Sequence, residues 1–127
     1  MIPEELKDIL EKNGFAHVAT IGPRGEPQNN PVWYSWDGEL ISISQNTDKQ
    51  KYRNLQRDPR VSLSIQDPDD PYRYLEVRGE VASIEPDADY GFIHSLANRY
   101  MGQDYPYLQP DEERLIVRIR PLHTTSM

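Results

Sequence analysis

The chain has 127 residues, a formal net charge of −7 and no cysteine. This length fits one domain over residues 1–127, and the lack of cysteine excludes disulfides, thiolate metal sites and cysteine nucleophiles. The negative charge argues against nucleic acids and anionic membranes as partners, and without a long apolar run or a signal-peptide pattern a cytoplasmic location is expected.

The first part of the chain is predicted as a short helix followed by three antiparallel strands. Apolar residues at helical spacing predict a helix over residues 3–12. Alternating patterns then predict strands over residues 15–21, 27–36 and 39–44. Asp37 and Gly38 form a tight hairpin signal between the last two strands.

The remainder alternates two predicted helices with three further strands. Thr47 and Gln50 fit a capping box, which predicts a helix from residue 47 to about residue 58. Strands are predicted over residues 61–65, 72–84 and 114–120, and Gly79 is expected to bend the longest of them. A second helix is predicted over residues 87–101, followed by a loop over residues 102–113. Six mostly sequential strands with short helices between them indicate an α+β fold, mainly antiparallel β, built as a barrel.

Basic residues gather in one stretch against the acidic trend of the chain. Residues 48–60 contain two acidic residues and the cations Lys49, Lys51, Arg53, Arg57 and Arg60. Lys49 and Lys51 fall in the first turn of the predicted helix, where the helix dipole disfavours cations unless an anion binds there. The stretch predicts a phosphate site. The alternative is a solvated helix face whose lysines point away.

A second candidate site is an amide-rich strand, whose residues are Gln28, Asn29, Asn30, Pro31 and Val32. Amide side chains can bind the donor and acceptor edge of a flavin-like ring, and a neighbouring aromatic residue can cover its face. The alternative is that the amides lie on a sheet edge and the aromatic residues at 33, 34 and 36 belong to a core or an interface. Because these aromatic side chains point to both faces of the strand, a partner subunit is expected.

The other polar residues give weaker signals. Tyr72, Tyr74 and Arg78 share one face of the long strand, where they either line a groove or lie on an outer surface. The three histidines are scattered without the spacing of a metal site, and neither a nucleophile elbow nor a phosphate-binding glycine loop is present. No metal site and no hydrolase is expected.

The order and spacing of these motifs resemble the pyridoxamine 5′-phosphate oxidase-like superfamily. The motifs lie at residues 17–21, 25–28, 34–36 and, most specifically, 49–61, which read KQKYRNLQRDPRV. Within this superfamily the chain looks most like the actinobacterial oxidoreductases that use the deazaflavin coenzyme F420. The resemblance implies a six-stranded split β-barrel with short flanking helices, which forms a homodimer with two cofactor sites at the interface.

The resemblance also implies roles for individual residues. Lys49 and Lys51 would hold the cofactor phosphate with Ser44 and Asn54 nearby, and residues 28–32 would run along the deazaflavin ring. The pocket would be completed, from the same or the other subunit, by Tyr74 and Arg78.

The implied activity is an F420-dependent transfer of a hydride to a small planar unsaturated substrate. The alternatives are an FMN-binding oxidoreductase of the same fold and a non-catalytic carrier of F420 or FMN. No catalytic side chain is assigned, because the cofactor supplies the hydride chemistry. Water, Tyr34 or Tyr74 would supply the proton.

Overall fold

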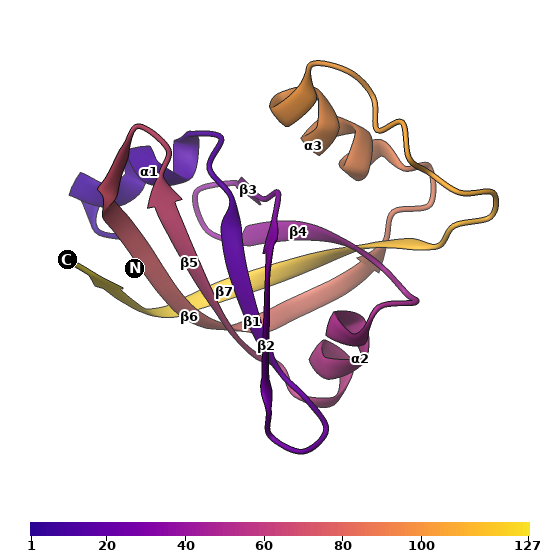
Figure 1. Cartoon of the computed structure of the whole chain (residues 1–127), viewed down its shortest axis with the longest axis horizontal. Helices are drawn as coiled ribbons and strands as arrows, with labels where there is room; N and C mark the ends of the chain where they lie inside the picture. The colour runs from indigo at the N-terminus through magenta and orange to yellow at the C-terminus, as the bar shows by residue number, and fades with distance from the viewer.

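The computed structural model describes residues 1–127 and shows one curled antiparallel sheet of seven strands in the order β2-β1-β5-β6-β7-β4-β3. The strands are β1 (Ala16–Ile21), β2 (Pro27–Val32), β3 (Ser35–Trp36), β4 (Ile41–Asn46), β5 (Arg60–Asp67), β6 (Asp70–Pro86) and β7 (Arg114–Ser126). The helices are the 3-10 helix η1 (Glu4–Leu6), α1 (Lys7–Glu11), α2 (Gln50–Arg57) and α3 (Gly91–Met101). In Figure 1, α2 and α3 lie at the lower and upper right of the sheet, and α1 lies at the upper left. None of the helices combines the length and the apolar character that a membrane crossing requires.

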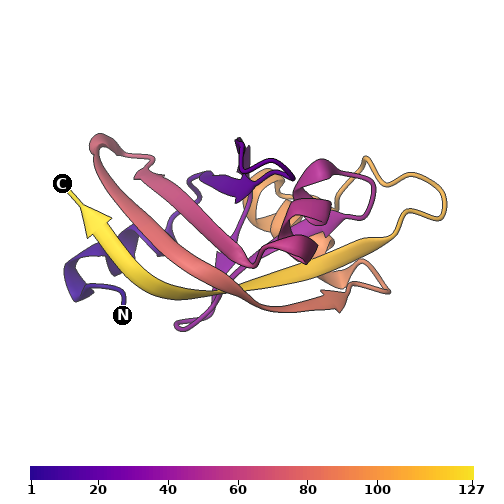
Figure 2. The same ribbon diagram turned by 90° about the horizontal axis from the view of Figure 1, so that it is seen from below.

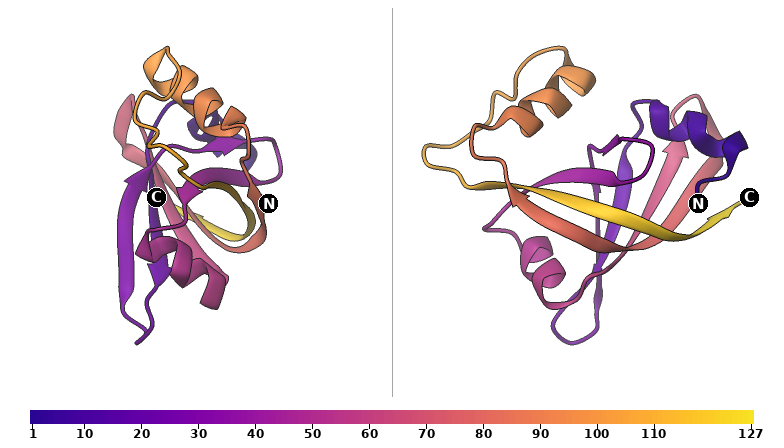
Figure 3. Two further views of the ribbon diagram at one scale, coloured as in Figure 1. Left: turned by 90° about the vertical axis from the view of Figure 1, so that its right-hand side faces the viewer. Right: turned by 180° about the vertical axis from the view of Figure 1, so that it is seen from behind.

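Apolar side chains on the inner face of the curled sheet form the core. In β5, Val61, Leu63 and Ile65 are buried while Ser64 and Gln66 are exposed, which is the period of two that the sequence predicts. The long strands β6 and β7 form a twisted pair along the back of the sheet (Figure 2). The open side of the curled sheet lies between α3 and α2 (Figure 3). The predicted α+β split barrel, mainly antiparallel, is confirmed.

The strand predicted over residues 27–36 is in fact two strands, so the sheet has seven strands where six were expected. β2 pairs with β1 at one edge of the sheet, whereas β3 pairs with β4 at the opposite edge. Trp33 and Tyr34 therefore carry the chain from one edge to the other. Tyr34 is completely buried and its hydroxyl donates to the carbonyl of Ile9 at 3.1 Å, which fixes this link.

Several element boundaries differ from the prediction. Thr47 does not cap a helix, because residues 47–48 form a turn and α2 begins only at Gln50, with no side-chain cap. α3 begins at Gly91 instead of residue 87, and the buried Asp87 carboxylate accepts hydrogen bonds from the backbone N–H groups of residues 92 and 93 at 3.0 Å each. The last strand runs to Ser126, beyond the predicted end at residue 120.

Arg99 anchors α3 to the N-terminal segment. Its guanidinium donates to the carbonyl of Lys12 at 2.7 Å and to the carbonyl of Tyr34 at 3.1 Å. The same group lies over the rings of Tyr34 and Tyr100, 5.4 Å and 5.5 Å from their centroids. Charged hydrogen bonds and cation-π contacts of this kind hold a helix firmly. α3 is thereby fixed next to the link between β2 and β3.

Gly79 lies at an irregularity of β6, as the sequence predicts. The register between β6 and β7 shifts between Arg78 and Gly79 and again between Val81 and Ser83. A Cβ atom at position 79 would collide with the backbone carbonyl oxygen of Arg120. Glycine is therefore required for the close approach of the two strands.

We expect Gly79→Ala to lower the free energy of unfolding by about 1–3 kcal/mol, because the added methyl group forces the backbones of β6 and β7 apart. Urea denaturation of the purified variant measures this loss. Ser64→Ala is the matched control on the exposed face of the neighbouring strand β5, and its change should stay within about 0.5 kcal/mol. Equal losses in the two variants would contradict the collision.

Candidate functional site

A cleft of about 260 Å³ opens between β2 and β4, at the open side of the sheet. Gln28 and Asn30 of β2 are paired with Thr20 and Val18 of β1, so their side chains face the inside of the barrel. β4, the turn that follows it and the start of α2 supply most of the other walls. We call this the polar cleft, because its lining has no apolar and no acidic side chain; it is lined by Gln28, Asn30, Ser44, Gln45, Asn46, Lys49, Gln50, Lys51 and Arg114.

β2 can border a cleft because it is an edge strand. It contains Pro27 and Pro31, which have no N–H group to donate and are therefore confined to the edges of sheets. β2 pairs with β1 on one side, and no strand pairs with its other side. The prolines and amides of this segment are thus compatible with a strand that faces a ligand site.

Lys51 is a buried cation without a counter-ion. Only 6% of the residue is exposed, yet its ammonium group has no hydrogen-bond or ion-pair partner in the chain. Burial, together with the nearby charge of Arg114, lowers the pKa of Lys51 from 10.5 to about 8. An unpaired buried charge is costly, and an anion in the cleft would offset this cost. The polar cleft is therefore suited to an anionic group.

The N-terminus of α2 adds to this preference for anions. Lys49 is the residue before the first turn, and its side chain is exposed. No side chain caps the helix, so its first backbone N–H groups are free of intrahelical partners beside the cleft. Such N–H groups and the positive end of the helix dipole favour phosphate binding.

Asn54 holds the amides of the cleft wall in place. It is fully buried, and its Nδ2 donates to Thr20 Oγ1 at 3.0 Å and to Gln28 Oε1 at 3.1 Å. Its Oδ1 accepts from Gln50 Nε2 at 2.8 Å. Asn46 Oδ1, in contrast, is buried without a partner, so a donor group of a ligand would satisfy it.

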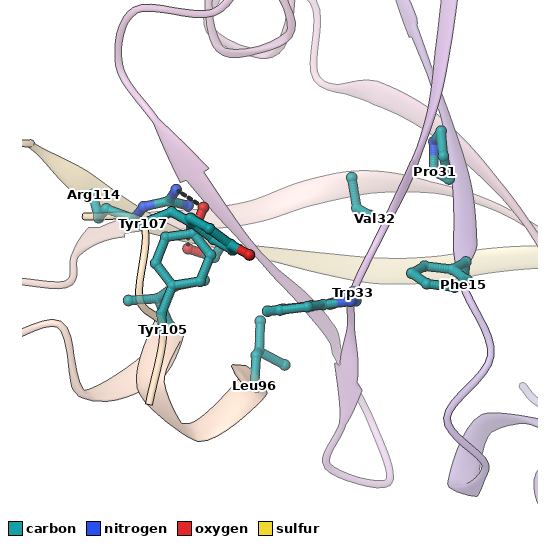
Figure 4. A pocket seen from close by; sticks show the side chains of 10 residues that line it. Phe15, Pro31, Val32, Trp33, Leu96, Tyr105, Tyr107 and Arg114 are labelled. Atoms are coloured by element: carbon teal, nitrogen blue, oxygen red, sulfur yellow. Dashed lines mark hydrogen bonds between the residues drawn. The ribbon is translucent and has the colours of Figure 1, made fainter. Parts of the chain in front are cut away.

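A second hollow of about 360 Å³ adjoins the polar cleft, next to α3 and the loop before β7. The Trp33 ring stacks on Tyr100 at 5.3 Å, and Tyr105 stands edge-on to Trp33 at 6.2 Å. Apolar pockets with flat aromatic walls favour planar ring systems. We call this the aromatic pocket (Figure 4); it is lined by Phe15, Pro31, Val32, Trp33, Ser44, Ile93, Leu96, Tyr105, Tyr107 and Arg114.

Ser44 and Arg114 line both hollows and so join them into one continuous site. Arg114 forms an ion pair with Glu112 at 2.6 Å. It also donates to Ser44 Oγ at 3.1 Å, the bond that is dashed in Figure 4. Its guanidinium also lies 5.0 Å from the centre of the Tyr105 ring. One end of the combined site is cationic and the other is aromatic.

Residues 2–127 match the profile of the pyridoxamine 5′-phosphate oxidase family. The chain belongs to this family. A solved structure named as an F420 reductase shares 41% identity, covers 98% of both chains and has a TM-score of 0.90. A conserved hypothetical protein from Mycobacterium tuberculosis shares 31% identity over 99% of this chain and 84% of its own, with a TM-score of 0.76.

More distant solved structures share only the fold with this chain. HupZ from Group A Streptococcus shares 22% identity, covers 100% of this chain and 94% of its own, and has a TM-score of 0.71. The family membership inferred from the motifs at residues 17–61 is confirmed.

The structure gathers most of the predicted site residues of this family member around the two hollows. The polar cleft contains Gln28, Asn30, Ser44, Lys49 and Lys51. Pro31 and Val32 line the aromatic pocket, and Asn54 lies beneath the polar cleft as a positioning residue.

Three predicted residues lie on the outer face of the sheet. Asn29 falls between two inward-facing amides of β2, and Tyr74 and Arg78 flank the buried residues of β6. None of the three lines the polar cleft or the aromatic pocket within one protomer.

Two features of the site differ from the sequence analysis. Tyr34 is no proton source, since it is buried in the core, burial raises its pKa, and its hydroxyl is bonded to the carbonyl of Ile9. Arg114 and Tyr105 were not predicted as site residues. They come from an aperiodic loop and the first residue of the strand that follows it, so only the folded chain brings them to the cleft.

The burial of Lys51 predicts a pH dependence of stability. The pKa of Lys51 is about 8 in the folded chain and 10.5 in the unfolded chain. At a pH between these two values, Lys51 is mostly deprotonated in the folded chain and mostly protonated in the unfolded chain. Stability therefore rises with pH in this window, because the cost of the buried ammonium group disappears. Relative to Lys51→Met, the wild-type chain should gain on the order of 2–3 kcal/mol of unfolding free energy from pH 7 to pH 10.5, measured by urea denaturation.

The control for this measurement is Lys49→Met, which removes an exposed lysine two positions earlier. Its difference from the wild-type chain should stay level over the same pH range. Level curves for both variants would show that Lys51 is not desolvated.

Proposed function

We propose that this chain is an F420-dependent oxidoreductase in which a hydride passes from reduced deazaflavin to a small planar unsaturated substrate. The observation that carries the proposal is the continuous site, where a buried lysine without a counter-ion is followed by an aromatic pocket. A cofactor whose phosphate and ring lie along the polar cleft, with a planar substrate beside it in the aromatic pocket, matches this order. The similarity to an F420 reductase, 41% identical over 98% of both chains, supports the same cofactor.

The residues of the polar cleft fit such a cofactor. Lys51 and Lys49 would hold the phosphate, and Gln28 and Asn30 would run along the ring, with Asn54 keeping the Gln28 amide in orientation. When bound, the deazaflavin supplies the hydride. The chain itself binds and orients the two reactants, and the apolar walls of the aromatic pocket keep water away from them.

We also propose a homodimer with the cofactor site at the subunit interface. Asn29, Tyr74 and Arg78 face outward from the sheet, so they can take part in a cofactor site only if the outer face meets a partner subunit. Tyr72 and Leu122, 78% and 51% exposed, add apolar area to the outside of the chain.

FMN is the alternative cofactor, because the polar cleft would accept its phosphate equally well. F420 differs by an anionic oligoglutamate tail, which needs further cations. Titration of the purified protein with F420 and, separately, with FMN distinguishes the two. A stronger salt dependence is expected for F420 than for FMN, because its extra charges are exposed to screening. Tight FMN binding with weak F420 binding would support the alternative, and binding without turnover of any acceptor would indicate a carrier.

We expect Lys51→Ala to weaken F420 binding by about 1.5–3 kcal/mol, which is typical of one charge-assisted hydrogen bond, and the combination with Lys49→Ala to weaken it by about 2–4 kcal/mol. Fluorescence titration measures both. The control is Arg60→Ala, which removes a cation from the same basic stretch. Arg60 is exposed and paired with Asp58 at 2.8 Å, outside both hollows. Equal effects of Lys51→Ala and Arg60→Ala would refute the phosphate assignment.

A further inference from the structure

The four lysines of the chain differ in how their amines are held. Lys7 and Lys12 form ion pairs with carboxylates at 2.7 Å and 2.9 Å. Lys49 is exposed to solvent. Lys51 is the only lysine that is buried, and its amine has neither a hydrogen-bond partner nor a counter-ion. This amine is therefore free to react with a molecule that enters the polar cleft.

The surroundings of Lys51 activate its amine as a nucleophile. A lysine reacts as the neutral amine, which is favoured where the side chain is desolvated or lies next to another cation. Lys51 meets both conditions, because it is buried and lines the polar cleft together with Arg114. With a pKa of about 8, about a quarter of its amines are neutral at pH 7.5, against on the order of one in a thousand for an ordinary lysine. The other ionisable groups of the lining are Lys49 and Arg114, so no carboxylate retains the proton.

The polar cleft also favours the kind of group that would direct an electrophile to this amine. The free N–H groups at the start of α2 and the cations Lys49 and Arg114 favour a phosphate. Lys51 lies in the first turn of α2, next to these groups, so a carbonyl carbon attached to a bound phosphate can meet its amine. A molecule that joins a phosphate directly to a reactive carbonyl carbon is an acyl phosphate.

We propose that Lys51 is a modification site, at which an acyl phosphate transfers its acyl group to the amine. The lone pair of the neutral Nζ attacks the carbonyl carbon and forms an N–C bond. The C–O bond to the phosphate breaks, phosphate leaves with the electron pair of that bond, and the nitrogen releases one proton to water. The leaving phosphate gains negative charge in this step, and Lys49, Arg114 and the start of α2 stabilise that charge.

Acylation of Lys51 would close the polar cleft to anions. The amide is neutral, so the cleft loses its buried cation and the acyl group takes up part of its 260 Å³. A bound phosphate has the opposite effect, because it occupies the position of the reagent and favours the protonated form of the amine. The modification therefore blocks anion binding at the empty site and spares the occupied one.

Acetyl phosphate is the probe for this reaction. The full chain is treated with it at pH 7.5, and peptide mass spectrometry follows the acetylation of each lysine. Lys51 should react about tenfold faster than Lys49, because its amine is more often neutral and the reagent is held beside it. Added inorganic phosphate should slow the reaction of Lys51 and leave that of Lys7, outside the cleft, unchanged. Equal rates at Lys49 and Lys51 would overturn the proposal.

A neutral ester separates guidance by the phosphate from the reactivity of the amine alone. p-Nitrophenyl acetate transfers the same acetyl group but carries no phosphate. The ratio of the Lys51 rate to the Lys49 rate should be about threefold lower with this ester than with acetyl phosphate, because nothing holds the ester in the cleft. The same ratio with both reagents would overturn the assignment to acyl phosphates.

Phosphate binding tests the consequence of the modification. Acetylated wild-type protein should bind inorganic phosphate about tenfold more weakly than untreated protein in a phosphorus NMR titration, since one charge-assisted hydrogen bond is lost. Lys51→Arg is the matched control, because arginine keeps the charge without a reactive amine, and the treatment should leave its phosphate affinity unchanged. An equal loss in this variant would assign the effect to another lysine and overturn the proposal. None of these measurements involves F420, so a failure of F420 to bind would defeat the proposed function and leave the acylation of Lys51 standing.

Discussion

The two-residue link between the sheet edges is the constraint on which the rest of the site depends. Trp33 and Tyr34 carry the chain from β2 to β3, so the two edges must meet there and are free to separate farther along. The burial of Tyr34 and its bond to the carbonyl of Ile9 fix the meeting point. Where the edges separate, the inward face of β2 borders open space instead of another strand, and Gln28 and Asn30 become walls of a cleft.

A polar site inside a barrel costs stability, and the structure confines that cost to one end. Thr20, Gln45, Lys51 and Asn54 are all buried around the polar cleft, whereas the rest of the inner face is covered by a core of aliphatic side chains. Asn54 bonds its neighbours, so the amides cost little. Lys51 has no such partner, and an anion bound in the cleft would offset its cost. Proteins usually leave polar groups unpaired only at ligand sites, where consistent packing gives way to function.

Features of the fold and the site that leave a local pattern in the sequence could be predicted from it, and contacts between distant residues could not. Alternation located the strands, and the basic stretch pointed to Lys51. The break between β2 and β3 at Trp33 could not be predicted, because residues 32–34 are all apolar or aromatic and suit a continuous strand equally well. Thr47 is a residue type that often caps helices, but a turn follows β4 and α2 begins only at Gln50. The outward direction of Asn29 follows from alternation alone and was predictable. The approach of Arg114 to Ser44 was not, because a 70-residue separation leaves no local pattern.

The two hollows of the site differ in how their positive charges are balanced. Arg114 is already paired with Glu112, while Lys49 and Lys51 face the polar cleft without carboxylates. A phosphate in that cleft would neutralise the two lysines. The guanidinium of Arg114, in contrast, is paired with Glu112 and bonded to Ser44 and Tyr105. Because Glu112 already balances the charge of Arg114, the aromatic pocket gains little from a second anion. The cationic end of the site is therefore suited to an anionic group, and the aromatic end is suited to a planar ring.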